Sequence, residues 1–365
     1  MPDRSERSII PRPDSRIATW TGGTNRIIGA MVSEALSLAR DVAIITNGES
    51  AQEQYDRGLS YYHGHRVPQD CAKAAKYFRN AAEQGHADAQ HSLGCCYTDG
   101  SGVPKDEPEA LKWFRRAAEQ GVAAAQNNLG VRYYNGRGVA QDYVEAMKWL
   151  RKAADQGATP AQTTVAMCYR DGRGVPRDYP EAVKWFRKAA EHGNADAQNS
   201  LGLCYQYGRG IPRDYTEALK WYRKAEKQGD GAARANLGIC YANGYGVPQD
   251  YGEAAKRFRI EAEKGAADAQ NNLGWCYRDG RGVPRDVLEA YMWFQLAADK
   301  GHQGAKEQAT ALAAGMTAPE FEAAHTLYRE KRDKRRSSLS GAASGSLGIS
   351  GDAGNTTKQI ENSDV

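Results

Sequence analysis

The stretch ADAQNSLGLCYQYGRGIPRDYTEALKWYRKAEKQG, residues 195–229, decides the fold because related stretches recur along the chain. If Gln54 is taken as offset 0, its equivalents follow at a constant step of 36 residues: Gln90, Gln126, Gln162, Gln198, Arg234 and Gln270. Tyrosine occupies offset +7 and aspartate occupies offset +16 in every copy. A period this regular over residues 51–305 predicts seven stacked structural repeats.

Each copy predicts two helices joined by a short loop. The segment 195–207 places Gln198, Leu201 and Tyr205 on one face of a helix of 3.6 residues per turn. The loop that follows contains paired glycines and a proline, which end this first helix. The second helix is expected to run from Tyr179 to about His192 in the fourth copy and to end at Gly193. The chain is therefore predicted to be an all-α solenoid of seven 36-residue helix-turn-helix repeats with capping helices.

The start of each second helix is marked by two carboxylates. Aspartate at offset +16 is followed three residues later by glutamate in six copies, as in Asp142 and Glu145. We interpret the pair as a helix N-cap with a reciprocal capping partner. A general acid and base would not be expected to recur in every copy along a line of helix starts.

Glycine at offset +4, inside the first helix, indicates close packing. A glycine there costs about 1 kcal/mol relative to alanine, so a large side chain is expected to approach the backbone. We expect this side chain to be the aromatic residue at offset +23, which is Trp113, Trp149, Trp185, Trp221 or Trp293 in five copies and Tyr77 in the first. Arg257 in the sixth copy and Ala166 at offset +4 in the fourth depart from the pattern, and we expect weaker joints there.

The charge and hydropathy of the chain argue against several classes of protein. The 365 residues include 49 basic and 45 acidic ones, a net charge of +4, which gives no basic face that would indicate a nucleic-acid partner. The apolar stretch 27–46 contains Glu34, Arg40 and Asp41, so neither a secretory signal nor a membrane span is expected. We expect a cytoplasmic protein. No cofactor, metal site or catalytic residue is expected.

Five of the seven cysteines occupy offset +6, one in each of five copies. If neighbouring copies lie roughly 20 Å apart, two helix layers of about 10 Å each, they are too distant to form disulfides, which need Cα atoms within about 7 Å. These thiols are therefore expected to be buried packing residues in a reducing compartment.

The two ends fall outside the repeat. Residues 1–50 form a separate segment whose stretch 24–40 is expected to be a helix that caps the first repeat, or alternatively a helix that docks a partner or forms a dimer. Residues 306–336 are expected to form a C-terminal capping helix with a basic end at 331–336, which is a solvated helix end or, alternatively, a nuclear-import or acidic-surface signal. The Ser/Gly-rich tail 337–365 is expected to be disordered.

The repeat resembles the Sel-1-like repeat, a relative of the tetratricopeptide repeat. The resemblance rests on the pattern A-x-x-x-L-G-x-x-Y-x-x-G-x-G-V-P-x-D-x-x-E-A-x-K-W-x-R-K-A-A-x-x-G, which segments 195–229 and 267–301 match closely. It implies a right-handed α/α superhelix that serves as a scaffold for protein partners, often in signalling or envelope-associated pathways. It also implies kinship with subunits of an endoplasmic-reticulum ubiquitin-ligase complex and with secreted cysteine-rich bacterial proteins described as binding or hydrolysing β-lactams. Those cysteine-rich members pair cysteines within one repeat, which the spacing here does not allow.

Chemistry-bearing motifs are scarce. His63 and His65 lie near Cys71, but no second pair of metal ligands stands at a fixed spacing. The first helix of each repeat instead presents variable residues at offsets +1, +2, +5 and +8, on the side opposite its core stripe. Asparagines there could bind a peptide backbone, and larger side chains would add selectivity. The expected partner-binding residues are Tyr62, Asn127, Asn128, Tyr134, Arg170, Asn199, Asn236, Asn271, Asn272, Trp275 and Arg278.

Three functions remain open from the sequence. The first is a non-enzymatic adaptor that binds a protein or extended peptide on the concave surface formed by the first helices, in a bacterial signalling or regulatory pathway. The second is an enzyme or binding protein for β-lactams, as the resemblance implies for cysteine-rich members. The third is a structural oligomer assembled through residues 1–50. The oligomeric state is left open.

Overall fold

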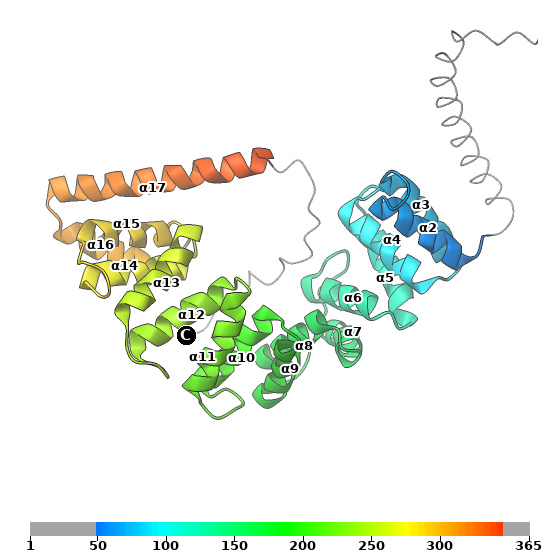
Figure 1. Cartoon of the computed structure of the whole chain (residues 1–365), viewed down its shortest axis with the longest axis horizontal. Coiled ribbons are helices and arrows are strands. Elements are labelled where there is room, and N and C mark those ends of the chain that lie inside the picture. Colours follow the sequence, from blue (N-terminus) through cyan, green and yellow to red (C-terminus); the bar gives the residue numbers. More distant parts are fainter. Residues whose placement is uncertain (1–48, 346–365) are drawn as a thin grey trace, which may run out of the picture. The chain divides into compact units, whose positions relative to one another are not determined.

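The computed structural model describes residues 49–345, and their side chains as far as residue 337. These residues form α-helices without any strand (Figure 1). The first helices of the repeats are α2 (Ala51–His63), α4 (Ala87–Asp99), α6 (Ala123–Asn135), α8 (Thr159–Asp171), α10 (Ala195–Tyr207), α12 (Gly231–Asn243) and α14 (Ala267–Asp279). The second helices are α3 (Cys71–Glu83), α5 (Glu107–Glu119), α7 (Tyr143–Asp155), α9 (Tyr179–Glu191), α11 (Tyr215–Lys227), α13 (Tyr251–Lys264) and α15 (Val287–Ala298). Two further helices, α16 (Gln303–Gly315) and α17 (Ala318–Gly345), follow the repeats.

The chain divides into two compact units, residues 1–140 and 141–365. Unit 1 contains α2 to α6 and unit 2 contains α7 to α17. From α2 to α6 and from α7 to α16 each helix packs against the next one along the chain, and α17 packs against α15. The predicted all-α solenoid of helix pairs is thereby confirmed.

The N-caps of the second helices are as predicted, but the role of the following glutamate is not. Asp286 accepts a hydrogen bond from the backbone N–H of Glu289 at 3.0 Å and therefore caps α15. The backbone N–H of Asp286 donates to the carbonyl of Tyr277 at 2.9 Å, so it does not need a reciprocal partner. The Glu289 carboxylate accepts instead from the indole N–H of Trp293 at 2.9 Å. The same glutamate–tryptophan bond recurs in α5, α7 and α9.

The aromatic residue that approaches the helix glycine stands at offset +24, one residue later than predicted. A Cβ added at Gly274 would lie 2.7 Å from the ring of Phe294, and one added at Gly202 would lie 2.5 Å from the ring of Tyr222. The tryptophan at offset +23 faces the preceding repeat instead of the glycine, since Trp113 packs with the core of that repeat. Spacing along one helix indicated an aromatic contact but could not say which of two adjacent aromatic side chains faces the glycine.

Consecutive repeats are joined by hydrogen bonds at fixed offsets. The glutamine at offset 0 is buried and donates to an alanine carbonyl near the end of the preceding second helix, as Gln198 does to Ala190 at 3.0 Å. The arginine at offset +25 donates to the hydroxyl of the tyrosine at offset +7 in the next repeat, as Arg187 does to Tyr205 at 3.1 Å. These two bonds explain why the sequence keeps glutamine and tyrosine at those offsets.

The end of the array is covered by α17, which lies alongside α15 (Figure 1). The ring of Phe321 contacts the ring of Tyr291 edge-on, and the Tyr328 hydroxyl donates to Asp299 at 2.7 Å. The helix extends to Gly345 and so continues through the basic run and past Arg336, where we expected it to end. The expected N-terminal helix at 24–40 and the tail from 346 onward lie outside the described residues.

All seven cysteines are free, and the five at offset +6 are buried. Burial raises the pKa of the Cys204 thiol to about 11 and that of the Cys168 thiol to about 12, so both remain protonated. The distance that we assumed between neighbouring repeats when predicting free thiols was too large. First helices of consecutive repeats are close enough to form hydrogen bonds with each other. Within residues 49–345 no helix combines the length and apolar composition that crossing a bilayer requires.

Candidate protein-binding surface

The candidate surface is the side of each first helix that carries offsets +1, +2, +5 and +8, named the first-helix face. In unit 2 it runs over α8, α10, α12 and α14. Most of its side chains are half-buried.

Offsets +1 and +2 form polar contacts between repeats. The Asn236 side-chain amide donates to the Asn199 side-chain oxygen at 2.9 Å, from α12 to α10. In unit 1, the Asn128 amide nitrogen lies 3.1 Å from Nε2 of His91, from α6 to α4. Asn128, Asn199 and Asn236 therefore take part in joining consecutive repeats. His91 was not among the predicted residues, although the 36-residue register places it at offset +1.

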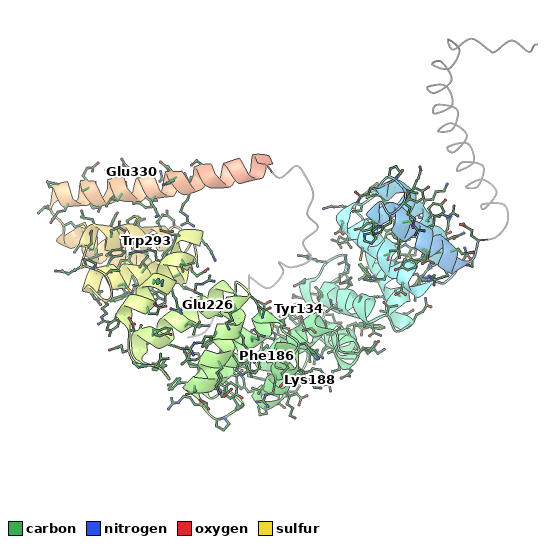
Figure 2. All side chains as sticks on the ribbon, in the orientation of Figure 1. Tyr134, Phe186, Lys188, Glu226, Trp293 and Glu330 are labelled. Carbon is green, nitrogen blue, oxygen red and sulfur yellow. The ribbon has the colours of Figure 1, made fainter. Side chains whose placement is uncertain are left out.

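Two predicted residues are too buried to offer a binding surface. Tyr134, labelled in Figure 2, is 6% exposed, and Asn199 is 5% exposed. Their position on the variable side of the helix was inferred from the repeat register alone. The register does not reveal that these two side chains are buried, so direct contact with a partner is not expected of them.

An aromatic and cationic platform occupies the α14 end of the face. The guanidinium carbon of Arg278 lies 3.6 Å from the centroid of a Trp275 ring. Arg278 also bonds to Asp279 at 2.7 Å and to the side-chain oxygen of Gln308 on α16 at 2.9 Å. Trp275 in turn contacts Phe294 edge-on. Several contacts thus hold both side chains in place, and Gln308 was not among the predicted residues.

The other predicted residues are placed less distinctively. Arg170 on α8 is half-buried and bonds to the neighbouring Asp171 at 2.7 Å. Tyr62, in unit 1, packs its ring near Phe78. The side-chain oxygens of Asn127 and Asn271 are buried and accept no hydrogen bond in the structure. Asn272 is half-buried beside Asn271 on α14.

The described residues provide little that would support catalysis or metal binding. Across 49–345 there is no group of three or more histidine, cysteine, aspartate or glutamate side chains that could hold a metal ion. The rings of His63 and His65 are 5.7 Å apart, the pair noted from the sequence. In unit 1, Cys95 lies 3.7 Å from His91, but burial raises the pKa of the Cys95 thiol to about 11 and lowers the pKa of His91. A neutral thiol beside a neutral imidazole is not an activated nucleophile.

Comparison with known proteins identifies the family. The Sel1 repeat model matches residues 54–86, 87–122, 123–157, 159–194, 195–230, 231–256 and 267–302, which is more than half of the chain. The structure of a Sel1 repeat protein from Oxalobacter formigenes is similar, with 35% identity and a TM-score of 0.57, over 72% of this chain and 76% of that one. A protective antigen of uropathogenic Escherichia coli that displays an SLR fold matches with 26% identity and a TM-score of 0.44, over 84% of this chain and 89% of that one. No curated protein matches. The chain therefore belongs to the Sel1 repeat family.

Proposed function

We propose that this protein is a non-enzymatic scaffold that binds a protein or an extended peptide on the first-helix face of unit 2. Sel1 repeat proteins are generally protein-interaction scaffolds, which supports the coarse assignment. We further propose that the scaffold acts in a regulatory or signalling assembly, as its family resemblance favours.

The observation that carries this proposal is the contrast between constant and variable offsets in the same helices. Offset +7 is tyrosine in every repeat, and its partners in the stack are equally regular. Offset +8, one residue later, is Arg170, Ala242 and Arg278 in α8, α12 and α14, all half-buried. In α10 this offset is Gln206, which is 4% exposed and accepts from the Tyr222 hydroxyl, so it is not part of the surface. A surface that varies on a constant framework is what a repeat protein uses to recognise one partner.

The chemistry of the face suits a peptide chain. Asn236 and Asn272 carry amide groups that can both donate to and accept from a peptide backbone. Trp275 and Arg278 are held in place before a partner arrives, so binding would cost little side-chain entropy. Aromatic and arginine side chains of this kind commonly dominate the binding energy of protein interfaces.

The test is a crosslinking and affinity-purification comparison in the native cell. The triple variant Asn236→Ala/Asn272→Ala/Arg278→Ala should lose the partners that the wild-type protein retains. A matched control removes exposed charges elsewhere in unit 2 through Lys227→Gln/Lys256→Gln/Lys306→Gln/Lys334→Gln, and it should retain them. The proposal is wrong if every partner still co-purifies with the triple variant, or if the purified protein turns over a substrate.

A further inference from the structure

A second surface of unit 2, distinct from the first-helix face, is formed by the loops that join first and second helices. These loops are residues 172–178, 208–214, 244–250 and 280–286. Gly174 has φ +72°, and a Cβ added there would overlap the carbonyl oxygen of Tyr143 in the preceding repeat. Gly282 makes the same contact with Tyr251. Each loop is therefore seated on the start of the preceding second helix, and the loops form one continuous edge.

In three of the four loops the residue between the two glycines is stacked on a tyrosine of the preceding repeat, whereas Arg209 lies over Tyr207 of its own repeat. The guanidinium of Arg173 lies 5.7 Å from the centroid of Tyr143, and that of Arg281 lies 5.5 Å from the centroid of Tyr251. In the loop 244–250 a tyrosine takes the place of this arginine. These contacts hold cationic and aromatic groups at the edge in a fixed arrangement.

Arginine recurs at two offsets of this edge, +11 and +15. The six residues, named the arginine edge, are Arg173, Arg177, Arg209, Arg213, Arg281 and Arg285. Arg173 and Arg281 form ion pairs with Asp171 and Asp279 at 4.0 and 3.6 Å. Within the described part of the chain the other four form no ion pair, and all four are exposed. Three of these four are held in place, Arg209 over Tyr207, Arg213 over Tyr215 and Arg285 by a hydrogen bond to the carbonyl of Arg278. Guanidinium groups without a carboxylate partner are well suited to carboxylates, which they bind with two parallel hydrogen bonds.

In unit 1 the feature is reduced: Arg137 occupies offset +11 in the loop that begins at Gly136, but the two earlier loops have no arginine at this offset. Its loops 64–70 and 100–106 carry His65 and Ser101 at offset +11, where unit 2 has arginine in three of its four loops. At offset +17, where unit 2 has the tyrosines of the edge, unit 1 has Cys71 and Glu107. The arginine edge is therefore not a requirement of the loop and points to a separate role.

We propose that the arginine edge binds an acidic, extended peptide segment of a partner protein. Arginine and tyrosine are enriched at protein interfaces, and carboxylates complement the four unpaired guanidinium groups. A nucleic acid is less well suited, because Asp171 and Asp279 and the helix N-caps Asp178, Asp214 and Asp286 are interspersed with the arginines. Such interspersed carboxylates repel a continuous polyphosphate, which needs a clearly basic surface.

The geometry also specifies a spacing for the acidic residues. First helices of consecutive repeats are in direct contact, as the bond between Asn199 and Asn236 shows, so equivalent loops lie about 10 Å apart. An extended peptide advances about 3.3 Å per residue. The preferred segment therefore carries an acidic residue at every third position. The loop 244–250 carries Tyr245 and Gln249 instead of arginines, so the acidic residue opposite it contributes least.

The test measures binding of a fluorescent peptide to the full-length protein by anisotropy. The probe is a Gly/Ser peptide of about twelve residues with glutamate at every third position, which spans four loops. The variant Arg177→Gln/Arg209→Ser/Arg213→Gln/Arg285→Gln introduces residues that equivalent loops already tolerate, as Gln249 and Ser101 show. We expect it to bind the probe at least about tenfold more weakly than wild type, which is about 1.4 kcal/mol.

Two controls separate specific binding from general attraction. Lys227→Gln/Lys256→Gln/Lys306→Gln/Lys334→Gln removes the same charge from other surfaces and should bind like wild type. A probe with glutamine in place of glutamate should not bind. The proposal is overturned if wild type does not bind the probe, if both variants lose affinity equally, or if single-stranded DNA of similar length binds more tightly. The first-helix variant Asn236→Ala/Asn272→Ala/Arg278→Ala should keep probe binding, so failure here leaves the proposed function standing.

Discussion

Repeats six and seven meet through neutral side chains, whereas repeats five and six meet through charged ones at the same offsets. Between repeats six and seven, Gln270 is fully buried and donates to the carbonyl of Ala262 at 3.0 Å. Trp293 is 3% exposed and packs against Phe258 of the preceding repeat. We name this contact the neutral junction.

The contact between repeats five and six differs at five equivalent positions, and we name it the charged junction. Arg234 stands where the neutral junction has Gln270, and Arg257 stands where it has Trp293. Arg234 pairs with Glu261, which is 5% exposed, and lies 3.4 Å from Glu226. Arg257 also pairs with Glu226, at 3.6 Å, and Figure 2 labels Glu226 and Trp293.

The fifth position, Gly231, shows that the residues of the charged junction depend on one another. Gly231 stands where the neutral junction has Ala267, and a Cβ added at Gly231 would overlap the carboxylate of Glu261. The Sel1 match to the sixth repeat ends at residue 256, immediately before Arg257. The comparison teaches that the offsets of the repeat specify where side chains meet, while the chemistry at a junction can be exchanged only as a set.

The largest expected effect comes from removing one member of the charged set. Arg234→Ala leaves the buried Glu261 with only Lys264 as a partner, at 2.9 Å, and it should lower the free energy of unfolding by about 3 kcal/mol, the lower end of the range for a broken buried ion pair. Urea denaturation followed by circular dichroism measures this. Lys227→Ala on the surface of α11 is the control and should change stability by less than about 0.5 kcal/mol.

Replacing the whole set should reverse that loss. The variant Glu226→Ala/Gly231→Ala/Arg234→Gln/Arg257→Trp/Glu261→Ala gives the charged junction the residues of the neutral one. Because neutral packing avoids the desolvation of buried charges, we expect stability equal to or greater than that of wild type. If this variant were less stable than Arg234→Ala, the five residues would not act as a set.

An intermediate effect is expected inside repeat seven, where a glycine of α14 meets an aromatic ring of α15. Gly274→Ala brings a methyl group within 2.7 Å of Phe294 and should cost about 1 to 3 kcal/mol, although alanine favours helices. The double variant Gly274→Ala/Phe294→Leu should recover part of the loss, since leucine stands at the equivalent offset in Leu150. Lack of any recovery in thermal or urea unfolding would show that the ring is not the cause.

Much of the fold was predictable because one period repeats it seven times. The two helices, the loop and the aspartate caps follow from the spacing, and the structure confirms them. The sequence did not show that Phe294, and not Trp293, faces Gly274, because adjacent aromatic residues share the same period. Nor did it show the charged junction beyond Arg257. Its other four members lie on three helices, α11, α12 and α13, and only packing brings them together.

The candidate surfaces were predictable in part. Offset patterns located the first-helix face, but they did not reveal that Tyr134 and Asn199 are buried. The contribution of Gln308 depends on α16, a helix beyond the last repeat. The stacking of loop arginines on tyrosines also joins residues of different repeats, so a single repeat read by itself does not reveal it.

The smallest expected effect is the loss of one helix cap, which should be equal at the two junctions. Asp250→Ala and Asp286→Ala each remove a cap from the second helix of repeats six and seven, where each carboxylate accepts a backbone N–H. Each should cost about 1 kcal/mol. Unfolding curves that differ by more than about 1 kcal/mol between the two variants would show that the charged junction alters the helix start as well.

The most direct test of the account is hydrogen–deuterium exchange of the full-length protein, resolved along the chain. Stacked helix pairs predict slow exchange in two blocks of helix per repeat, recurring every 36 residues over 51–298, with fast exchange in the glycine loops between them. Protection that does not follow this period, or that is confined to one region of the repeats, would contradict it.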